Sequence, residues 1–140
     1  MAANTTPIFT LTPVIGQARL ITSSSFRDGS EVTQLLSAGA DGTRIDTITF
    51  TSAPTASAYT VNTAMVGRVF ISDTAGSNYR LFQEVDISAV TPSVSAIGAT
   101  QTISFVGGLN IPSGSKIAVN KSAHAGVQDV IDVIARGGNY

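Results

Sequence analysis

The residue best able to do chemistry is His124, the only histidine, which lies among small residues in the segment Ser-Ala-His-Ala-Gly at positions 122–126. In a serine hydrolase its imidazole would take a proton from a serine hydroxyl, and an acid such as Asp129 or Asp132 would orient it. No G-x-S-x-G nucleophile elbow accompanies the histidine, however. We therefore interpret His124 as a solvated loop side chain, and the hydrolase stays a minor alternative.

Two acids, Glu84 and Asp86, are two positions apart and would project from the same face of a strand. Such a pair could serve a glycosidase, which uses two carboxylates across a cleft that aromatic rings usually line. Aromatic residues make up only 6% of the chain and tryptophan is absent. A solvated strand face is the simpler interpretation of these carboxylates.

The sequence gives little support for a metal site or a phosphate site. Structural zinc takes four Cys or His ligands, and the chain has one histidine and no cysteine. Residues 73–78 offer oxygen atoms to calcium but lack the acid spacing of an EF-hand loop, so a hairpin turn is favoured. Gly107-Gly108 is not part of a G-x-G-x-x-G phosphate loop. The sequence therefore predicts no catalytic, cofactor-binding or metal-binding residue, and no enzyme.

The low charge limits the classes of partner. Charged residues are 12% of the 140 residues and the net charge is −1, whereas soluble domains usually have about 25%. A nucleic-acid-binding domain would carry a broad positive patch, which this balance excludes. The arginines suit ion pairs with carboxylates, because they are interleaved with acids at Arg19, Arg27, Arg44, Arg68 and Arg80. A weakly charged surface favours burial against protein partners.

The ratio of Val and Ile to Leu indicates the fold class. The chain has 26 Val and Ile against 6 Leu, and β-branched side chains pack well on a pleated sheet, whereas Leu leads in helices. The 33 Ser and Thr do not signal disorder, because the mean hydropathy of +0.27 is too high. The sequence predicts an all-β protein.

Short apolar runs between turn residues predict about eight strands, too many for one sheet with a solvated face. We expect an antiparallel β-sandwich resembling a jelly roll. The expected strands are 17–22, 32–37, 44–51, 65–72, 79–87, 100–106, 116–120 and 127–135.

Strict alternation is expected within two of these strands. In 44–51, Ile45 and the odd-numbered threonines would share one face, with Ile48 and Phe50 on the other. In 79–87, Tyr79 and Leu81 would share the face of Val85 and Ile87. The last run, 127–135, also fits a helical stripe, but its β-branched residues favour a strand that Gly137-Gly138 would stop.

Residues 1–13 are predicted to form an extended N-terminal arm or edge strand, followed by one sandwich domain over residues 14–140. Pro7 and Pro13 bracket the arm and remove two amide donors, which disfavours a central strand. The arm has no basic n-region, and no apolar run approaches the ~20 residues that span a membrane. We therefore expect a protein made in a host cytoplasm, with no membrane partner.

Four stretches of the sequence resemble small proteins encoded beside the major capsid protein of tailed bacteriophages. They are residues 4–13 (NTTPIFTLTP), 39–46 (GADGTRID), 69–73 with 79–84 (VFISD, YRLFQE) and 108–114 (GLNIPSG). The resemblance is to head decoration, or cement, proteins. It implies a β-sandwich virion protein that forms a homotrimer on the capsid exterior and stabilises contacts between major capsid subunits.

Within that family, we expect Ile8, Phe9 and Leu11 to anchor the arm on the capsid or on a sister subunit, by adding a strand to a sheet edge. A carbohydrate- or receptor-binding module, such as a head fibre or tail adhesin, is the alternative, because jelly rolls often serve as lectins. Besides phenylalanine, only Tyr59, Tyr79 and Tyr140 could stack on a sugar ring in such a module.

Overall fold

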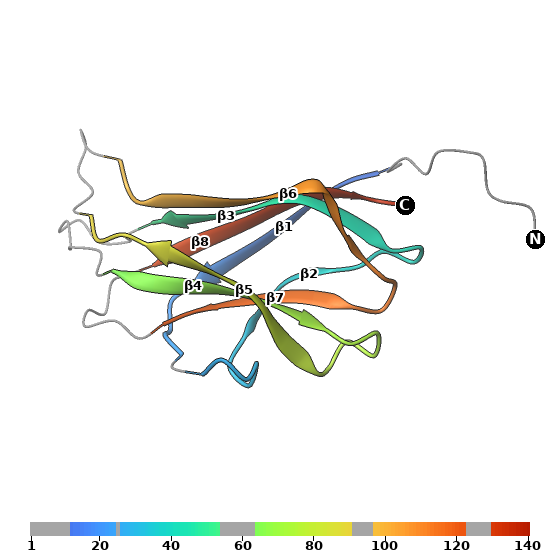
Figure 1. Cartoon of the computed structure of the whole chain (residues 1–140), viewed down its shortest axis with the longest axis horizontal. Coiled ribbons are helices and arrows are strands. Elements are labelled where there is room, and N and C mark those ends of the chain that lie inside the picture. Colours follow the sequence, from blue (N-terminus) through green and yellow to red (C-terminus); the bar gives the residue numbers. More distant parts are fainter. Residues whose placement is uncertain (1–11, 25, 54–63, 91–96, 123–129) are drawn as a thin grey trace, which may run out of the picture.

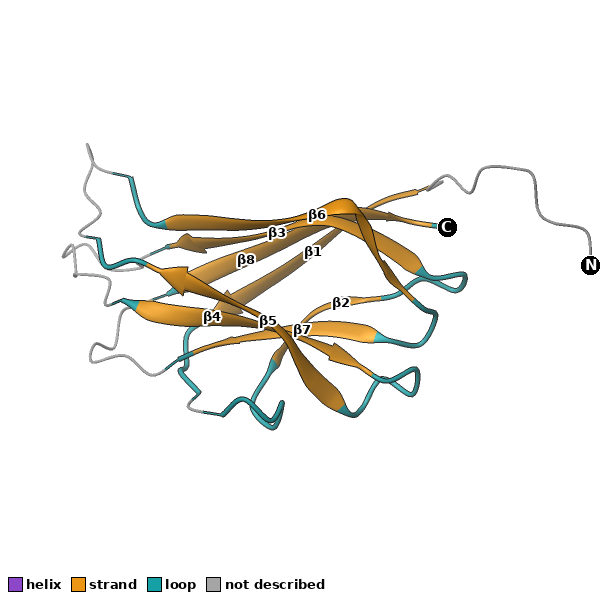
Figure 2. Cartoon of the chain, in the orientation of Figure 1, coloured by secondary structure: helices purple, strands orange, loops and turns teal. Residues whose placement is uncertain are grey.

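The computed structural model describes residues 12–24, 26–53, 64–90, 97–122 and 130–140. Within them the chain forms eight strands and no helix, which confirms the all-β prediction (Figure 2). The strands are β1 (Thr12–Leu20), β2 (Thr33–Ser37), β3 (Thr43–Ser52), β4 (Met65–Ser72), β5 (Tyr79–Ile87), β6 (Thr100–Ile111), β7 (Lys116–Lys121) and β8 (Ile131–Asn139).

The strands form two four-stranded antiparallel sheets stacked as two layers (Figure 1). Sheet A has the order β1-β8-β3-β6 and sheet B the order β2-β7-β4-β5. β1 lies near β2 at one lateral edge of the sandwich, and β5 lies near β6 at the other. Every connection except the one between β4 and β5 crosses from one sheet to the other, and this strand order is that of a jelly roll, so the predicted sandwich is confirmed.

The core between the sheets consists mainly of aliphatic side chains, most often Val and Ile, that alternate along the strands. Fully buried members come from both layers: Ile45, Ile48 and Phe50 of β3, Val69 of β4, Ile117 and Val119 of β7, and Ile131 and Val133 of β8. Many of the Val and Ile residues that indicated a β fold therefore lie in this core.

A β-bulge in β3 breaks the alternation predicted for residues 44–51. Ile45 pairs with Gly137 and Thr47 with Arg136, so Asp46 is the extra residue. The bulge turns Ile45 to the same side as Ile48, and both are fully buried. The prediction that Ile45 shares a face with Thr47 is wrong for this reason.

The glycines of the last strand do not stop it, contrary to our prediction. β8 continues through Gly137 and Gly138, which pair with β1 and β3 on either side. A Cβ atom on Gly137 would lie 1.9 Å from the carbonyl oxygen of Arg44, beside the bulge of β3. Glycine is therefore needed for close packing here. Residues 131–135 are strand, not helix, while 127–129 lie outside the described residues.

β6 likewise extends beyond Val106, where we expected it to end. Its pairing with β3 changes from Ser104 opposite Thr47 to Leu109 opposite Ile45, which inserts residues into β6. Gly107 and Gly108 both have a φ of 81°, a conformation that only glycine adopts at low cost. The glycine pair therefore marks a large bulge rather than the end of a strand.

β1 begins at Thr12, so Thr12 and Pro13 of the predicted arm pair with β8. β1 is an edge strand of sheet A, a position in which proline is tolerated. Residues 1–11, including the predicted anchors Ile8, Phe9 and Leu11, lie outside the described residues.

We predict that Gly137→Ala lowers the free energy of unfolding by about 3 kcal/mol or more, because the new methyl group would overlap the Arg44 carbonyl and force the backbone of β3 or β8 to move. Urea unfolding followed by circular dichroism measures the change. Gly107→Ala is the control, since no atom lies within 4 Å of its added Cβ and only backbone strain of about 1–2 kcal/mol is expected. Equal losses in the two variants would contradict the steric explanation.

Candidate functional site

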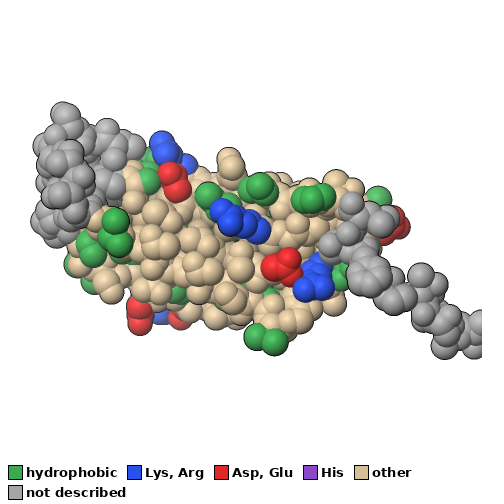
Figure 3. All heavy atoms as spheres, turned by 90° about the horizontal axis from the view of Figure 1, so that it is seen from above, with side chains coloured by type: hydrophobic (Ala, Val, Ile, Leu, Met, Phe, Trp, Pro, Cys, Tyr) green, Lys and Arg blue, Asp and Glu red, His purple; other side chains and the backbone are tan. Residues whose placement is uncertain are grey.

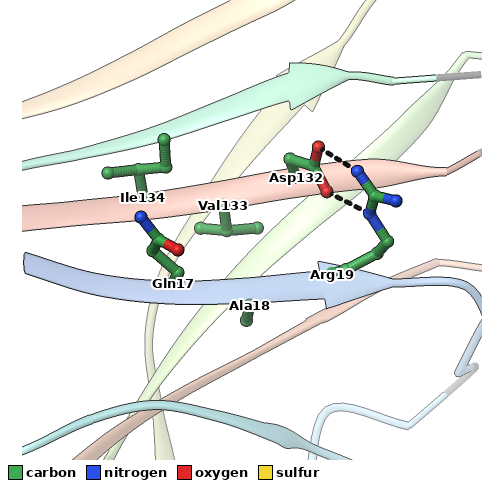
Figure 4. Close-up of a pocket in the computed structure, with 6 residues that line it drawn as sticks. All are labelled: Gln17, Ala18, Arg19, Asp132, Val133 and Ile134. Atoms are coloured by element: carbon green, nitrogen blue, oxygen red, sulfur yellow. Dashed lines mark hydrogen bonds and ion pairs between the residues drawn. The ribbon is translucent and has the colours of Figure 1, made fainter.

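Of the residues considered for hydrolase chemistry, only Asp132 is described, since His124 and Asp129 lie outside the described residues. Asp132 accepts two hydrogen bonds from Arg19, at 2.7 and 2.8 Å, on the outer face of sheet A (Figure 4). These bonds hold the pKa of Asp132 below its usual value. The carboxylate is thus occupied by a guanidinium and is not placed to orient an imidazole.

The ion pair borders a shallow hollow of about 300 Å³ between β1 and β8 (Figure 4). Its lining has no hydroxyl, thiol or imidazole group that could act as a nucleophile or base: it consists of Gln17, Ala18, Arg19, Asp132, Val133 and Ile134. The hollow is therefore a feature of a sheet surface rather than a catalytic cleft.

The carboxylate of Glu84 is also engaged. Its Oε1 accepts hydrogen bonds from the Nε atoms of Arg27, at 2.7 Å, and Arg68, at 3.0 Å. Both bonds lower the pKa of Glu84. A glycosidase needs one carboxyl group with a raised pKa as its acid. Glu84 has the opposite shift, and Asp86 forms no ion pair within the described residues.

Arg68 is the centre of this cluster and is only 3% exposed. Its Nη1 donates to the carbonyl oxygen of Ser24 at 3.0 Å and to that of Phe26 at 3.5 Å. On β7, Asn120 pairs with Arg68 across the sheet and donates to the carbonyl oxygens of Phe26 and Glu31. Side chains of sheet B thus bind the backbone of the segment between β1 and β2.

That segment, residues 21–24 and 26–32, lies over the outer face of sheet B (Figure 1). Phe70 follows Arg68 by two positions on the same face, and it is fully buried although it is not part of the core between the sheets. Gly29 of the segment lies against Tyr79 of β5. The segment therefore covers an apolar patch that would otherwise face water.

A second bulge places apolar side chains at one lateral edge. Val69 pairs with Gln83 and Phe70 with Leu81, so Phe82 is the extra residue in β5. Leu81 consequently shares the outer face of Phe70, and its predicted grouping with Val85 and Ile87 is wrong. Leu81 is 36% and Phe82 44% exposed.

Phe82 contacts Phe105 of β6, with ring centroids 6.0 Å apart. Val106, at the β6 bulge, is fully exposed. We call Leu81, Phe82 and Val106 the open edge. Both strands that carry it, β5 and β6, are edge strands. Large exposed apolar side chains next to unpaired strand edges are typical of interaction sites.

The outer face of sheet A is a regular array of hydroxyl groups with few charges. Across the sheet, Gln17, Ile134, Thr49 and Thr102 lie side by side in one row. The hydroxyls of Thr49 and Thr102 are hydrogen-bonded at 3.0 Å. The space-filling view of this side shows scattered ionic and apolar side chains on a mostly neutral surface (Figure 3). Such a face can be buried with little cost of desolvating charge.

A groove beside Tyr140 combines an aromatic ring with polar groups. Its volume is about 710 Å³, and its lining consists of Asp41, Gly42, Asn110, Ile111, Pro112 and Tyr140. The Tyr140 hydroxyl donates to Oδ1 of Asn110, while the Asp41 side chain is exposed. An aromatic ring flanked by an acid and an amide is a combination suited to binding a polyhydroxylated ligand.

The predicted hairpin turn at residues 73–78 is confirmed. Oδ1 of Asp73 accepts the backbone N–H of Ser77 and Oδ2 accepts the side-chain amide of Asn78, and both bonds lower the pKa of Asp73. These oxygens therefore serve the turn. No three His, Cys, Asp or Glu side chains among the described residues could hold a metal ion.

Sequence reasoning missed the Arg68 cluster and the open edge. One signal for the former was available, because Arg68 is the one charge within the apolar run of β4, where a buried residue must be paired. The open edge depends on two bulges. Only Gly107-Gly108 pointed to one of them, and these glycines were interpreted as the end of a strand.

The lowered pKa of Glu84 predicts acid sensitivity. A carboxylate whose pKa is depressed by folding stabilises the protein above its usual value of 4.5, and that stabilisation is lost as the pH falls through the lower pKa of the folded state. Glu84→Gln should therefore flatten the decline in the free energy of unfolding below about pH 4.5, measured by denaturant titrations at successive pH values. Asp86→Asn is the matched control, and identical profiles for the two variants would contradict the prediction.

No protein-family model matches the sequence, and no curated protein matches it. The part of the chain that the structure describes contains no helix able to cross a membrane. Among the described residues, the outer face of sheet A, the open edge and the Tyr140 groove are surfaces on which a partner or ligand could bind.

Proposed function

We propose that this chain is a structural virion protein, a decoration or cement protein that binds the outside of a tailed-bacteriophage capsid and stabilises contacts between major capsid subunits. The resemblance of four sequence stretches to such proteins supports this function. The jelly-roll order of the strands supports it too, because viral structural domains often have this fold.

The outer face of sheet A is the observation that carries the proposal. A decoration protein must bury a broad surface on the capsid without leaving charges unpaired. Here the threonines of β3 and β6 form the middle of the face, and Arg19 with Asp132 and Arg44 with Asp46 form ion pairs. Arg136, exposed opposite Thr47, forms no ion pair within the described residues and is the charge that the capsid would have to match. We assign this face as the surface that contacts the major capsid protein.

The described carboxylates favour a structural role over an enzymatic one. Asp132 and Glu84, which sequence reasoning offered for catalysis, are bound by arginines that keep them ionised. Ile8, Phe9 and Leu11 remain the proposed anchors of the N-terminal arm. The arm precedes an edge strand of sheet A, so it leaves the domain beside the proposed contact face.

We predict that Thr102→Glu abolishes co-sedimentation with capsids that lack the protein, because it would bury a carboxylate in the contact. Thr74→Glu, at the tip of the β4–β5 hairpin, is a matched control, since both threonines are exposed. Circular dichroism checks that both variants fold. Equal binding of the two variants would overturn the assignment of this face, and cryo-electron microscopy that finds no copies on the capsid would overturn the function.

The Tyr140 groove favours a second candidate function, a carbohydrate-binding virion module. Sugar sites combine an aromatic platform with a few polar groups, and Tyr140, Asp41 and Asn110 supply them here. Tyr59 lies outside the described residues, while Tyr79 lies against Gly29.

If this second function holds, the chain should bind a reproducible set of sugars on a glycan array, and Tyr140→Ala should reduce that binding at least tenfold by removing the aromatic platform. Tyr79→Ala, on the opposite sheet, is the matched control. If the chain binds no sugar on the array and co-purifies with capsids, the carbohydrate-binding function is excluded.

A further inference from the structure

β5 offers the two features that a strand-addition site needs, which are an unpaired backbone edge and exposed apolar side chains. β5 is the last strand of sheet B, so one side of its backbone has no neighbouring strand within the described residues. Leu81 and Phe82 project from it, partly exposed, and Phe82 contacts Phe105 of β6. An incoming strand would gain main-chain hydrogen bonds from β5 and apolar contacts from these side chains.

The other edge strands are β1, β2 and β6. β1 lies against β2, since a Cβ atom on Gly16 would be 2.6 Å from the carbonyl oxygen of Leu35. β2 has only five residues and a register shift in its pairing with β7. β6 is interrupted by the bulge at Gly107 and Gly108. β5 has its own bulge at Phe82, but it pairs with β4 without a further shift from Gln83 to Ile87, directly beside Leu81 and Phe82.

The N-terminal arm has the composition of a matching strand. Residues 1–11 carry no charged side chain, and residues 8–11 read Ile-Phe-Thr-Leu. If this stretch is extended, Phe9 and Leu11 fall on one face, two positions apart. Eleven residues span up to about 36 Å, long enough to cover all of β5. Pro7 would lie near the beginning of the paired stretch, where a missing amide is tolerated.

The strand order determines which copy can accept the arm. The arm leaves from β1, at one lateral edge of the sandwich, whereas β5 lies at the opposite edge. To reach its own β5, the arm would have to cross the width of a four-stranded sheet, about 14 Å, and the thickness between the sheets. A neighbouring copy placed edge to edge presents its β5 without this detour.

We propose that residues 8–11 of one copy add as a strand to β5 of a second copy, with Phe9 and Leu11 covering Leu81 and Phe82. Donor and acceptor lie on opposite edges, so a head-to-tail contact between copies is heterologous, and it forms a ring where the rotation between neighbours closes. We propose that three copies close this ring, which is the trimer that the resemblance implies. This inference deepens the proposed anchoring role of the arm and names its partner as a sister subunit.

The test measures the mass of the purified chain by light scattering after size-exclusion chromatography. The parent should form a ring, whereas the variant lacking residues 2–11 and Phe82→Glu should each be monomeric. Mixing the two variants should restore association as a one-to-one complex, because one keeps the acceptor edge and the other keeps the arm. Ile21→Glu is the control, since Ile21 is 61% exposed but lies outside the edge strands, and it should leave the ring intact.

A parent that stays monomeric at high concentration would overturn this inference, and so would a Phe82→Glu variant that keeps the parent's mass or a mixture that fails to associate. These outcomes are separable from failure of the proposed function. If the chain is a monomer that still binds capsids, the strand exchange is contradicted and the decoration function is not. If the chain forms a ring that does not bind capsids, the decoration function is contradicted and the strand exchange is not.

Discussion

Arg68 places a permanent positive charge in the middle of β4, where only 3% of the residue reaches solvent. An isolated charge in such a position would cost several kcal/mol, so the chain must surround it with acceptors. Glu84 supplies a carboxylate from β5, and Ser24 supplies a carbonyl oxygen from the segment before β2. The bond from Arg68 to Glu84 joins β4 to β5, and the bond to Ser24 holds that segment over the outer face of sheet B, the face on which Phe70 is buried.

One covered sheet makes the sandwich asymmetric. Residues 21–24 and 26–32 cover the outer face of sheet B, whereas side chains of sheet A form the described part of the surface seen in Figure 3. The bulges add a second asymmetry, because those in β5 and β6 lie at one lateral edge, where Leu81 and Phe82 are partly exposed. The outer face of sheet A and the open edge are therefore separate surfaces. The face is suited to a large flat partner, and the edge is suited to a short extended segment.

The strands could be predicted from the sequence because Val, Ile and turn residues act locally, as the Asp73 turn illustrates. Irregularities could not, since a bulge at Asp46 or Phe82 depends on the register of strands distant in sequence. The prediction that Gly137-Gly138 would stop the last strand was wrong for the same reason. Gly137 is required by the carbonyl group of Arg44, 93 positions earlier, and not by any local turn. The proposed anchors, Ile8, Phe9 and Leu11, stay a prediction.

The position of β8 has a consequence for biosynthesis. It lies between β1 and β3, so sheet A cannot be completed until Asn139 has left the ribosome. Before then β1 and β3 lack their common neighbour, and the apolar residues of β3 have no finished layer around them. The pairing of β8 with β1 joins residues more than 100 positions apart, and contacts of such long sequence separation slow folding and prolong the exposure of unpaired strands.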